Sequence, residues 1–410
     1  MKNLAVKSSL LGVTMFLSFI STSILSSDNI VYAAQNINQG PPDNWEGHPP
    51  IHIKKAATVS PTGLIPNQIR HAYGFDKLNC SYTGTFGSST LCGNGQTIAI
   101  VDAYDDPNIQ NDLNAFSNQF GLPTCTSANG CFVKATPQGK PRSDAGWALE
   151  ESLDVQWAHA IAPGAKIILV EAKTASFGNL LNAVDYAVNK GANQVSMSWG
   201  GSEFSSEANY DFHFNKNNVS FFASSGDSGS GTIYPSVSPY VVSVGGTTLN
   251  LDSFGNVTSE TSWTGSGGGT SIYESEQSYQ INYGISSNGK RDVPDVSYDA
   301  NPNTGVPVYD SFGYQGSKGW FQVGGTSAGA PQWAAISAIT NTARGTPMSS
   351  TSYGTDTLLY GAATGSSYSV NYRDITSGNN GGFSAGTGYD LVTGLGSPLS
   401  NNLISYLQIN

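Results

Sequence analysis

Short apolar runs alternate with amphipathic stretches between residues 96 and 244. The runs are typical of buried strands and cover Gln96–Asp102, Lys166–Val170, Gln194–Ser198, Val219–Ser224 and Tyr240–Val244. Helical periodicity lies between them, near Asn108–Phe120, Trp147–Ala160 and Phe177–Lys190. Apolar strands that alternate with helices indicate an α/β fold, with a doubly wound, mainly parallel sheet covered by helices on both faces.

The pattern changes on either side of this region. Residues 251–320 are rich in Gly, Ser, Asn and Tyr and predict hairpin-like strands and long loops. One further helix is predicted over Ser327–Ala343. Residues 34–60 are rich in Pro, Asn and Gln and lack periodicity, so we expect a mobile arm there. The remainder, residues 61–410, is expected to form one large domain.

The N-terminus has the layout of a secretory signal. Lys2 and Lys7 precede an apolar stretch over Leu10–Leu25, and Val31-Tyr32-Ala33 offers a cleavage site. An uncleaved membrane anchor is the alternative, but polar residues interrupt the run and the cleavage site follows it. We therefore predict a signal peptide over residues 1–33, and a secreted, extracellular protein that has no membrane contact after cleavage.

The composition limits the classes of molecule that this protein can bind. Only 11% of residues are charged, against roughly 25% in an ordinary soluble protein, and 29 acidic residues outnumber 18 basic ones. A net charge of -11 argues against nucleic acid or an anionic membrane as the main partner, since either needs a basic face.

The four cysteines predict disulfides. An even number in a secreted chain favours two bonds, and three pairings are open. Cys80–Cys92 and Cys125–Cys131 are favoured because each pair flanks a short loop rich in Gly, Ser and Thr or Asn. A zinc site is the rival, but neither a C-x-x-C spacing nor a neighbouring histidine supports it.

A candidate nucleophile, Ser327, lies in a Gly-Gly-Thr-Ser-Ala-Gly-Ala-Pro run over residues 324–331. The glycines allow a tight turn, and Pro331 suits the first turn of a helix. Free backbone N–H groups at that helix end would favour negative charge on the serine oxygen, although a serine there is also a common N-cap. None of the five histidines stands in a recognisable catalytic motif; His48 and His52 fall in the expected arm.

Carboxyls offer a different base. Glu150 and Asp154 are four residues apart on a predicted helix and so share a face. The alternative is a solvated acidic face, but Leu149, Leu153 and Trp157 make this helix mostly apolar. Two carboxyls placed together can share a proton and split their pKa values, which suits a general base that works in acid.

The ends of two predicted strands supply further candidate site residues, because binding and catalytic residues in open α/β sheets usually lie at the carboxyl ends of the strands. Asp227 follows Val219–Ser224, where a simple turn aspartate is equally compatible. Ser198, Trp199 and Gly200 lie at the end of the predicted strand Gln194–Ser198. The glycines there leave a backbone edge open for an extended peptide, and Trp199 could line a side-chain pocket.

Together these motifs resemble the sedolisin (serine-carboxyl) peptidases, relatives of the subtilisins. The resemblance covers the chain from about Ser60 onward and rests on motifs in family order: E-x-x-x-D at Glu150 and Asp154, S-x-S-W-G at 196–200, S-G-D-S-G at 225–229 and G-T-S-A-x-A-P at 325–331. Glu151 is a competing carboxylate, but the motif register selects Glu150. The resemblance implies a subtilisin-like fold.

It also implies roles for the candidates. Ser327 would attack the peptide carbonyl, Glu150 would take the serine proton, and Asp154 would orient Glu150. Asp227 would lie in the oxyanion hole, where it must be protonated to help, and this predicts activity in acid. Asp102 occupies the place of the subtilisin triad aspartate and is left outside the catalytic set.

The C-terminal stretch 374–396 resembles the family's calcium loop. The implied ligands are the side chains of Asp374 and Asp390 and the carbonyls of Ile375, Gly386 and Gly388. These are the oxygen donors that calcium prefers, and the alternative is a Gly-rich loop with two exposed acids.

The sequence thus predicts a monomeric, secreted endopeptidase that hydrolyses proteins or peptides at acidic pH and carries one structural calcium. A tripeptidyl exopeptidase of the same family and a non-catalytic binding protein on a peptidase scaffold are the alternatives. Only about 27 residues separate Ala33 from the start of the resemblance, so we expect no large prodomain.

Overall fold

A mainly parallel sheet forms the centre of the computed structural model, which describes residues 40–285, 288–349 and 353–410. Its strand order is β10-β9-β7-β5-β2-β4-β3, and β13 pairs with β9. The strands are β2 (Thr97–Ala103), β3 (Phe132–Ala135), β4 (Lys166–Ala172), β5 (Gln194–Met197), β7 (Ser220–Ser224), β9 (Val241–Leu251), β10 (Val257–Ser262) and β13 (Val296–Asp299). Only the β9–β10 pair is antiparallel among these strands. The predicted signal peptide, residues 1–33, lies outside the described residues.

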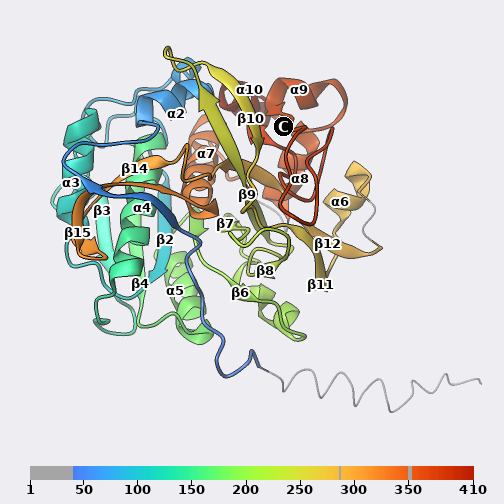
Figure 1. The fold of residues 1–410 in the computed structure, drawn as a ribbon, viewed down its shortest axis with the longest axis horizontal. Helices are drawn as coiled ribbons and strands as arrows, with labels where there is room; N and C mark the ends of the chain where they lie inside the picture. Colours follow the sequence, from blue (N-terminus) through green and yellow to red (C-terminus); the bar gives the residue numbers. More distant parts are fainter. Residues whose placement is uncertain (1–39, 286–287, 350–352) are drawn as a thin grey trace, which may run out of the picture. The chain divides into compact units, whose positions relative to one another are not determined.

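Helices cover both faces of this sheet (Figure 1). They are α3 (Ile109–Phe120), α4 (Ala145–Ile161), α5 (Phe177–Asn189) and α7 (Gly329–Arg344). Side chains alternate along β2, so Ile98 and Ile100 join the core beneath α4 and α7, whereas Ala99 and Val101 join the core beneath α5. The predicted α/β architecture is therefore confirmed.

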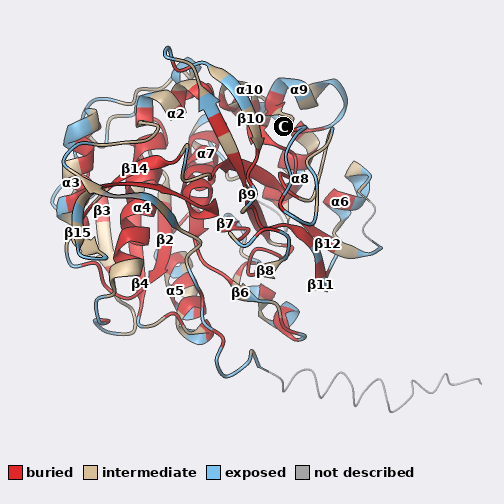
Figure 2. Ribbon diagram, in the orientation of Figure 1, coloured by how far each residue is buried: buried red, intermediate tan, exposed pale blue. Residues whose placement is uncertain are grey.

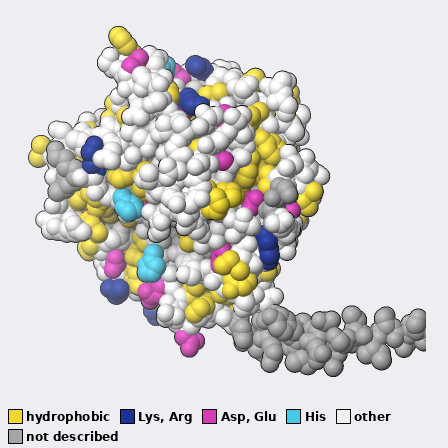
Figure 3. Space-filling view, turned by 45° about the vertical axis from the view of Figure 1, so that its right-hand side comes forward, with side chains coloured by type: hydrophobic (Ala, Val, Ile, Leu, Met, Phe, Trp, Pro, Cys, Tyr) yellow, Lys and Arg dark blue, Asp and Glu magenta, His cyan; other side chains and the backbone are white. Residues whose placement is uncertain are grey.

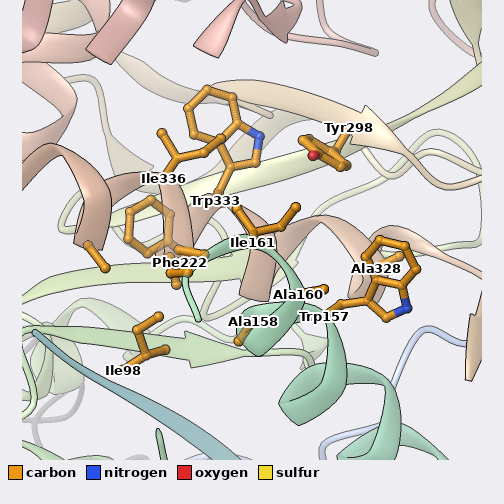
Figure 4. Close-up of a cluster of buried hydrophobic side chains, with 14 of the residues drawn as sticks. Ile98, Trp157, Ala158, Ala160, Ile161, Phe222, Tyr298, Ala328, Trp333 and Ile336 are labelled. Atoms are coloured by element: carbon orange, nitrogen blue, oxygen red, sulfur yellow. The ribbon is translucent and has the colours of Figure 1, made fainter. Parts of the chain in front are cut away.

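Helix α4 is buried on nearly every side (Figure 2). In Figure 4, Trp157 and Ile161 of α4 lie in one apolar cluster with Trp333 and Ile336 of α7. A helix that is apolar all round must be enclosed, and this enclosure also removes the polar side chains of α4 from water.

Smaller elements surround this centre. A second sheet has the order β1-β15-β14 and consists of β1 (His52–Thr58), β15 (Ser317–Gly324) and β14 (Val306–Tyr314). The other strands pair in twos and are β6 (Gly201–Ser202), β8 (Ile233–Tyr234), β11 (Gly269–Ser275), β12 (Lys290–Val293), β16 (Tyr372–Arg373) and β17 (Ser397–Pro398). The other α-helices are α2 (Pro66–Ala72), α6 (Ser278–Tyr283), α8 (Gly354–Ala362), α9 (Tyr368–Asn371) and α10 (Ser400–Ile409). The 3-10 helices are η1 (Phe75–Lys77), η2 (Glu207–His213), η3 (Thr326–Ala328) and η4 (Gly365–Ser367).

The prediction of a mobile arm over residues 34–60 is wrong for its second half. Residues 52–58 form β1, which pairs antiparallel with β15. The partner strand lies more than 250 residues away in the sequence, so local periodicity could not reveal the pairing. Residues 34–39 lie outside the described part of the chain.

Both favoured disulfides are present, Cys80–Cys92 and Cys125–Cys131. Their formation leaves no free thiolate among the described residues for the rival zinc site. Among those residues the structure has no helix that is both long and apolar enough to cross a bilayer. On the face drawn in Figure 3, Lys and Arg side chains are scattered and do not gather into a basic patch.

Candidate active site

Three neighbouring strands end at the candidate site. Asp102 lies near the end of β2, Ser198 follows β5, and Asp227 follows β7. Parallel strands put their carboxyl ends at one edge of the sheet, so these residues from distant parts of the sequence come together there.

Ser327 lies in η3, the turn that joins β15 to α7. Gly325 before it has φ 120°, a conformation that favours glycine. The Ser327 side chain is buried, and its Oγ has no hydrogen-bond partner among the described residues. The predicted position at a helix N-terminus is confirmed, with one 3-10 turn before α7 begins.

Glu150 and Asp154 lie on one face of α4, and both are fully buried. Asp102 of β2 faces both of them, and none of the three carboxyls has a hydrogen-bond partner or a cation among the described residues. Burial raises the pKa of each well above its usual value. Repulsion from Asp102 adds to the rise for Glu150 and Asp154, and repulsion from Glu171 adds to it for Asp102. The cluster therefore holds protons to a higher pH than isolated carboxyls would.

Two serines, Ser327 of η3 and Ser198, lie beside this cluster. The nearby Ser327 hydroxyl lowers the pKa of Glu150, opposing burial, although the two side chains do not meet in ordinary hydrogen-bond geometry. The Ser198 hydroxyl lowers the pKa of Asp154 in the same way and donates a 3.3 Å hydrogen bond to the carbonyl of Ser327. Loose contacts of this kind are common before substrate binds.

Asp227 follows β7 and contacts η3, the turn that contains Ser327. Its Oδ1 accepts hydrogen bonds from the backbone N–H and the hydroxyl of Thr326, both 2.8 Å long. Its Oδ2 is buried and lies 3.3 Å from His52 Nε2. Burial raises the pKa of Asp227, while the contacts with His52 and Thr326 lower it.

The predicted peptide-binding edge is already paired. Gly200 and His48 exchange backbone hydrogen bonds of 3.0 and 3.3 Å as an isolated antiparallel bridge. Trp199 is fully buried below this pair and donates to the carbonyl of Val101 at 2.7 Å. It therefore packs beneath the edge, and it lines the surface against which Gly47 lies.

Sequence reasoning missed His52. Its Nε2 lies 3.3 Å from Asp227 Oδ2, and its ring packs edge-on against Trp263 with centroids 5.6 Å apart. The signal that could have found it is the alternation of Ile51 and Ile53 with His52 and Lys54, a short strand pattern at the end of the expected arm. His159, by contrast, is fully buried on α4, and burial lowers its pKa to about 4.

The loop 374–396 packs beside the segment that follows Asp227, where the N–H of Ser230 donates to the carbonyl of Asn380 at 3.0 Å. Asp374 accepts from the N–H of Gly388 and the hydroxyl of Tyr368, and Asp390 accepts from the N–H of Gly386. The two carboxylates thus meet the same short turn, and neither forms an ion pair with a described residue. Two carboxylates without an ion pair, together with the backbone carbonyls of the loop, are a donor set that fits calcium in kind.

Comparison with known proteins agrees with this geometry. The model of the subtilase family matches residues 143–389, a range that contains Glu150, Asp154, Asp227 and Ser327. The chain belongs to the subtilase family. Within it, the relatives described next make it a member of the sedolisin family.

Kumamolisin from Bacillus sp. (strain MN-32) is 31% identical over 396 residues, which cover 86% of this chain and 65% of that protein. Sedolisin from Pseudomonas sp. (strain 101) is 29% identical and covers 87% and 63%. Tripeptidyl-peptidase 1 from Dictyostelium discoideum is also 29% identical and covers 86% and 60%. This sedolisin-family chain thus spans less than two thirds of the length of each.

The fold of a sedolisin has been solved in a complex. Pseudomonas sedolisin, titled a serine-carboxyl proteinase and bound to two molecules of pseudo-iodotyrostatin, superposes with a TM-score of 0.69 and 27% identity. The match covers 86% of this chain and 99% of that one. The subtilisin-like architecture of the present chain is therefore established.

Proposed function

We propose that this chain is a secreted, monomeric serine-carboxyl endopeptidase that hydrolyses protein substrates at acidic pH. The observation that carries the proposal is the position of Ser327, whose free hydroxyl lies at the start of α7 beside the buried Glu150. A hydroxyl in that position has a base on one side and free backbone N–H groups on the other.

In the proposed reaction, Ser327 Oγ attacks the substrate carbonyl and passes its proton to Glu150. Glu150 then delivers the proton to the leaving amine, so the same carboxyl serves as base and acid. Asp154, four residues along α4, positions Glu150, and the two carboxyls share a proton. Peptide substrates would pair with the edge at Gly200, which already forms antiparallel hydrogen bonds.

The oxyanion would form between the Ser327 backbone N–H and Asp227. A carboxylate there would repel it, so Asp227 must carry a proton on Oδ2, the oxygen that Thr326 leaves free. Burial of Asp227 favours that proton, and this is the physical reason to expect activity in acid.

The test is a pH–rate profile on denatured casein for the wild type, Ser327→Ala and Asp227→Asn. We expect hydrolysis below about pH 6, and Ser327→Ala should abolish it. Asp227→Asn should lose the decline toward neutral pH, because an amide donates a hydrogen bond at any pH. Equal hydrolysis by the wild type and Ser327→Ala would refute the serine mechanism.

A tripeptidyl exopeptidase is the second candidate, favoured by the similarity to tripeptidyl-peptidase 1. Mapping the N-termini of the products separates the two, since an exopeptidase releases only tripeptides. The map of an endopeptidase contains internal cuts far from either end of the substrate.

Calcium would bind at Asp374 and Asp390, with the carbonyls of Ile375, Gly386 and Gly388 completing the ligands. Bound there, the cation would neutralise two carboxylates and hold the loop in place. Adding a chelator should then lower the melting temperature of the wild type, and Asp390→Asn should be insensitive to the chelator. An identical shift in both chains would place the calcium elsewhere.

A further inference from the structure

The loop 374–396 contacts two other loops through one residue, Asn380. Its side chain is 3% exposed, and its Nδ2 donates to the carbonyl of Ser266 at 3.0 Å. Its backbone carbonyl accepts from the N–H of Ser230 at 3.0 Å. Ser230 lies three residues after Asp227, and Ser266 belongs to the loop between β10 and β11. Asn380 therefore joins three loops that are distant in the sequence, and in Figure 1 the red chain of the first reaches down to the yellow-green chain that leaves β7.

The turn around Asn380 fixes the orientation of its side chain. Its Oδ1 accepts from the N–H groups of Gly382 and Phe383 at 3.3 and 2.9 Å, and its own N–H donates to the carbonyl of Phe383 at 3.0 Å. Because Oδ1 is used as an acceptor inside the turn, the amide has one orientation, and Nδ2 points toward Ser266. The position thus needs a donor and an acceptor on one short side chain, which asparagine supplies.

The β10–β11 loop holds the backbone on both sides of Asp227. The carbonyl of Gly226 accepts from the N–H of Gly267 at 2.7 Å, and the N–H of Gly229 donates to the carbonyl of Gly265 at 2.9 Å. Asp227 lies between these two hydrogen bonds. A shift of the β10–β11 loop would therefore displace the Asp227 carboxyl.

The loops are packed too closely to absorb such a shift. Gly229 has φ 77°, and a Cβ built on it would lie 2.6 Å from the carbonyl oxygen of Asn380. A Cβ built on Gly382 would lie 2.5 Å from the side chain of Ser230. Close-packed interiors have low compressibility, so a displacement of Asn380 passes to the residues that follow Asp227.

Asp227 needs this support because its carboxyl can act only from one position. Thr326 holds Oδ1 with two hydrogen bonds of 2.8 Å, and in the proposed function Oδ2 carries the proton that meets the oxyanion. Oxyanion donors act through preorganisation, and a displacement of about 1 Å removes much of the effect of such a group.

We propose that Asn380 is a positioning residue for Asp227. It joins the loop 374–396 to the β10–β11 loop and to Ser230, and so holds the Asp227 carboxyl where the oxyanion forms. In this role Asn380 does not touch the substrate and acts only through the backbone that carries Asp227. The inference rests on the proposed function, since it treats Asp227 as the oxyanion group.

The first experiment compares Asn380→Ala with Asn379→Ala in steady-state hydrolysis of an internally quenched peptide at pH 4. Asn379 is a matched control, because it is exposed in the same turn and accepts from the N–H of Gly381 within that turn at 3.1 Å. Asn380→Ala should lower kcat roughly tenfold, a part of the loss that follows removal of an oxyanion donor, and should change KM by less than about twofold. Asn379→Ala should match the wild type. Equal kcat per folded molecule in Asn380→Ala and the wild type would overturn the inference.

A conservative variant serves if Asn380→Ala does not fold. Asn380→Asp keeps the acceptor of the turn and changes only the donor. In acid the neutral carboxyl can donate to the carbonyl of Ser266, whereas the ionised carboxylate repels it. The kcat of Asn380→Asp relative to the wild type should therefore fall between pH 3 and pH 6. A ratio that stays constant would contradict the positioning role of the donor.

The second experiment tests whether Asn380 acts through Asp227. Asp227→Ala removes the oxyanion group and should slow hydrolysis by roughly a hundredfold. In that background Asn380→Ala should cause no further loss, because no carboxyl is left to position. A further tenfold loss in the double variant would show that Asn380 acts elsewhere and would sink the inference alone. Equal rates for Asp227→Ala and the wild type would instead refute the proposed role of Asp227, and the inference with it.

Discussion

Two adjacent glutamates on α4, Glu150 and Glu151, are equally buried and have very different surroundings. Glu151 accepts from the N–H of Asp106 at 3.2 Å and lies beside Glu171, whose carboxylate pairs with Lys134 at 2.6 Å. Glu150 has no such cation and no hydrogen-bond partner among the described residues; it faces Ser327 and other carboxyls.

The difference separates a buried carboxyl that has a cation nearby from one that has none among the described residues. Burial raises the pKa of both glutamates, and neighbouring carboxyls raise both further. The opposing influence differs: the ammonium of Lys134 lowers the pKa of Glu151, whereas the Ser327 hydroxyl lowers that of Glu150. A buried carboxylate whose charge is balanced by a nearby cation is stable in its ionised form and has little tendency to take up a proton. An uncompensated carboxyl beside a free hydroxyl is ready to exchange one, and such groups gather at functional sites.

The largest effect should come from replacing each glutamate by its amide. Glu150→Gln removes the proposed base and should lower kcat by roughly a thousandfold, within the usual contribution of general base catalysis. Glu151→Gln should change kcat by less than about threefold. Steady-state hydrolysis of casein at pH 4, with circular dichroism to verify folding, measures both.

A larger loss of activity in Glu151→Gln than in Glu150→Gln would contradict the proposed difference between the two glutamates. If Glu151→Gln were inactive and well folded while Glu150→Gln retained activity, the base would be Glu151 and the motif register would be misplaced by one residue.

The second prediction concerns the pH dependence of stability. Burial raises the pKa of Glu171 to about 6 and that of Asp106 to about 7, so the folded chain binds these protons more tightly than the unfolded chain. Stability is then full in acid and falls as the pH rises through these values, by about 2 kcal/mol for Glu171 alone. Urea unfolding at pH 4 and pH 7 measures it, and Glu171→Gln should give a shallower slope. Greater stability at pH 7 than at pH 4 would contradict the sign.

The third prediction concerns the loss of Lys134, the cation that lies beside Glu171 and Glu151. Lys134 is one-quarter exposed and contacts both Asp105 and Glu171, so Lys134→Met should lower the free energy of unfolding by about 1–2 kcal/mol at pH 7. Activity per folded molecule should not change. Lys140→Met is the control, because Lys140 is 78% exposed and 3.7 Å from the same Asp105. Loss of activity in folded Lys134→Met would mean that the two groups of carboxyls act together.

The smallest effect should come from Asp102→Asn. Removing the Asp102 carboxyl removes a group that raises the pKa of Glu150, so the acid limb of the pH–rate profile should move to lower pH. The neutral limb, which we assign to Asp227, should stay in place. A shift of the neutral limb alone would mean that Asp102 acts on a different group.

Local pattern predicted the elements of the sheet well, because each strand and helix there is specified by its own apolar residues. The runs at Lys166–Val170 and Phe177–Lys190, for example, correspond to β4 and α5 within two residues. The spacing of Glu150 and Asp154 likewise implied one face of α4, since helical geometry is local. The motifs placed Ser327 and Asp227 at turns, but spacing alone does not show that they meet.

Contacts between segments that are distant in the sequence could not be predicted from local pattern. β1 was read as an arm because its partner strand β15 is distant and its own sequence is only weakly alternating. His52 was therefore set aside among residues without a role. A contact between positions 52 and 227 depends on how two separate loops are brought together, and no local signal encodes it.

The sequence by itself predicted most strands and helices of the central sheet, favoured the two disulfides that form and supplied the set of chemical groups, because these depend on local periodicity, short loops and residue type. Only the tertiary structure decided which carboxyls are compensated and which loops meet around Asp227. Neighbouring glutamates 150 and 151 differ because α4 turns one toward Ser327 and the other toward Lys134. Electrostatic character is set by what a side chain faces, and that depends on packing across the whole fold.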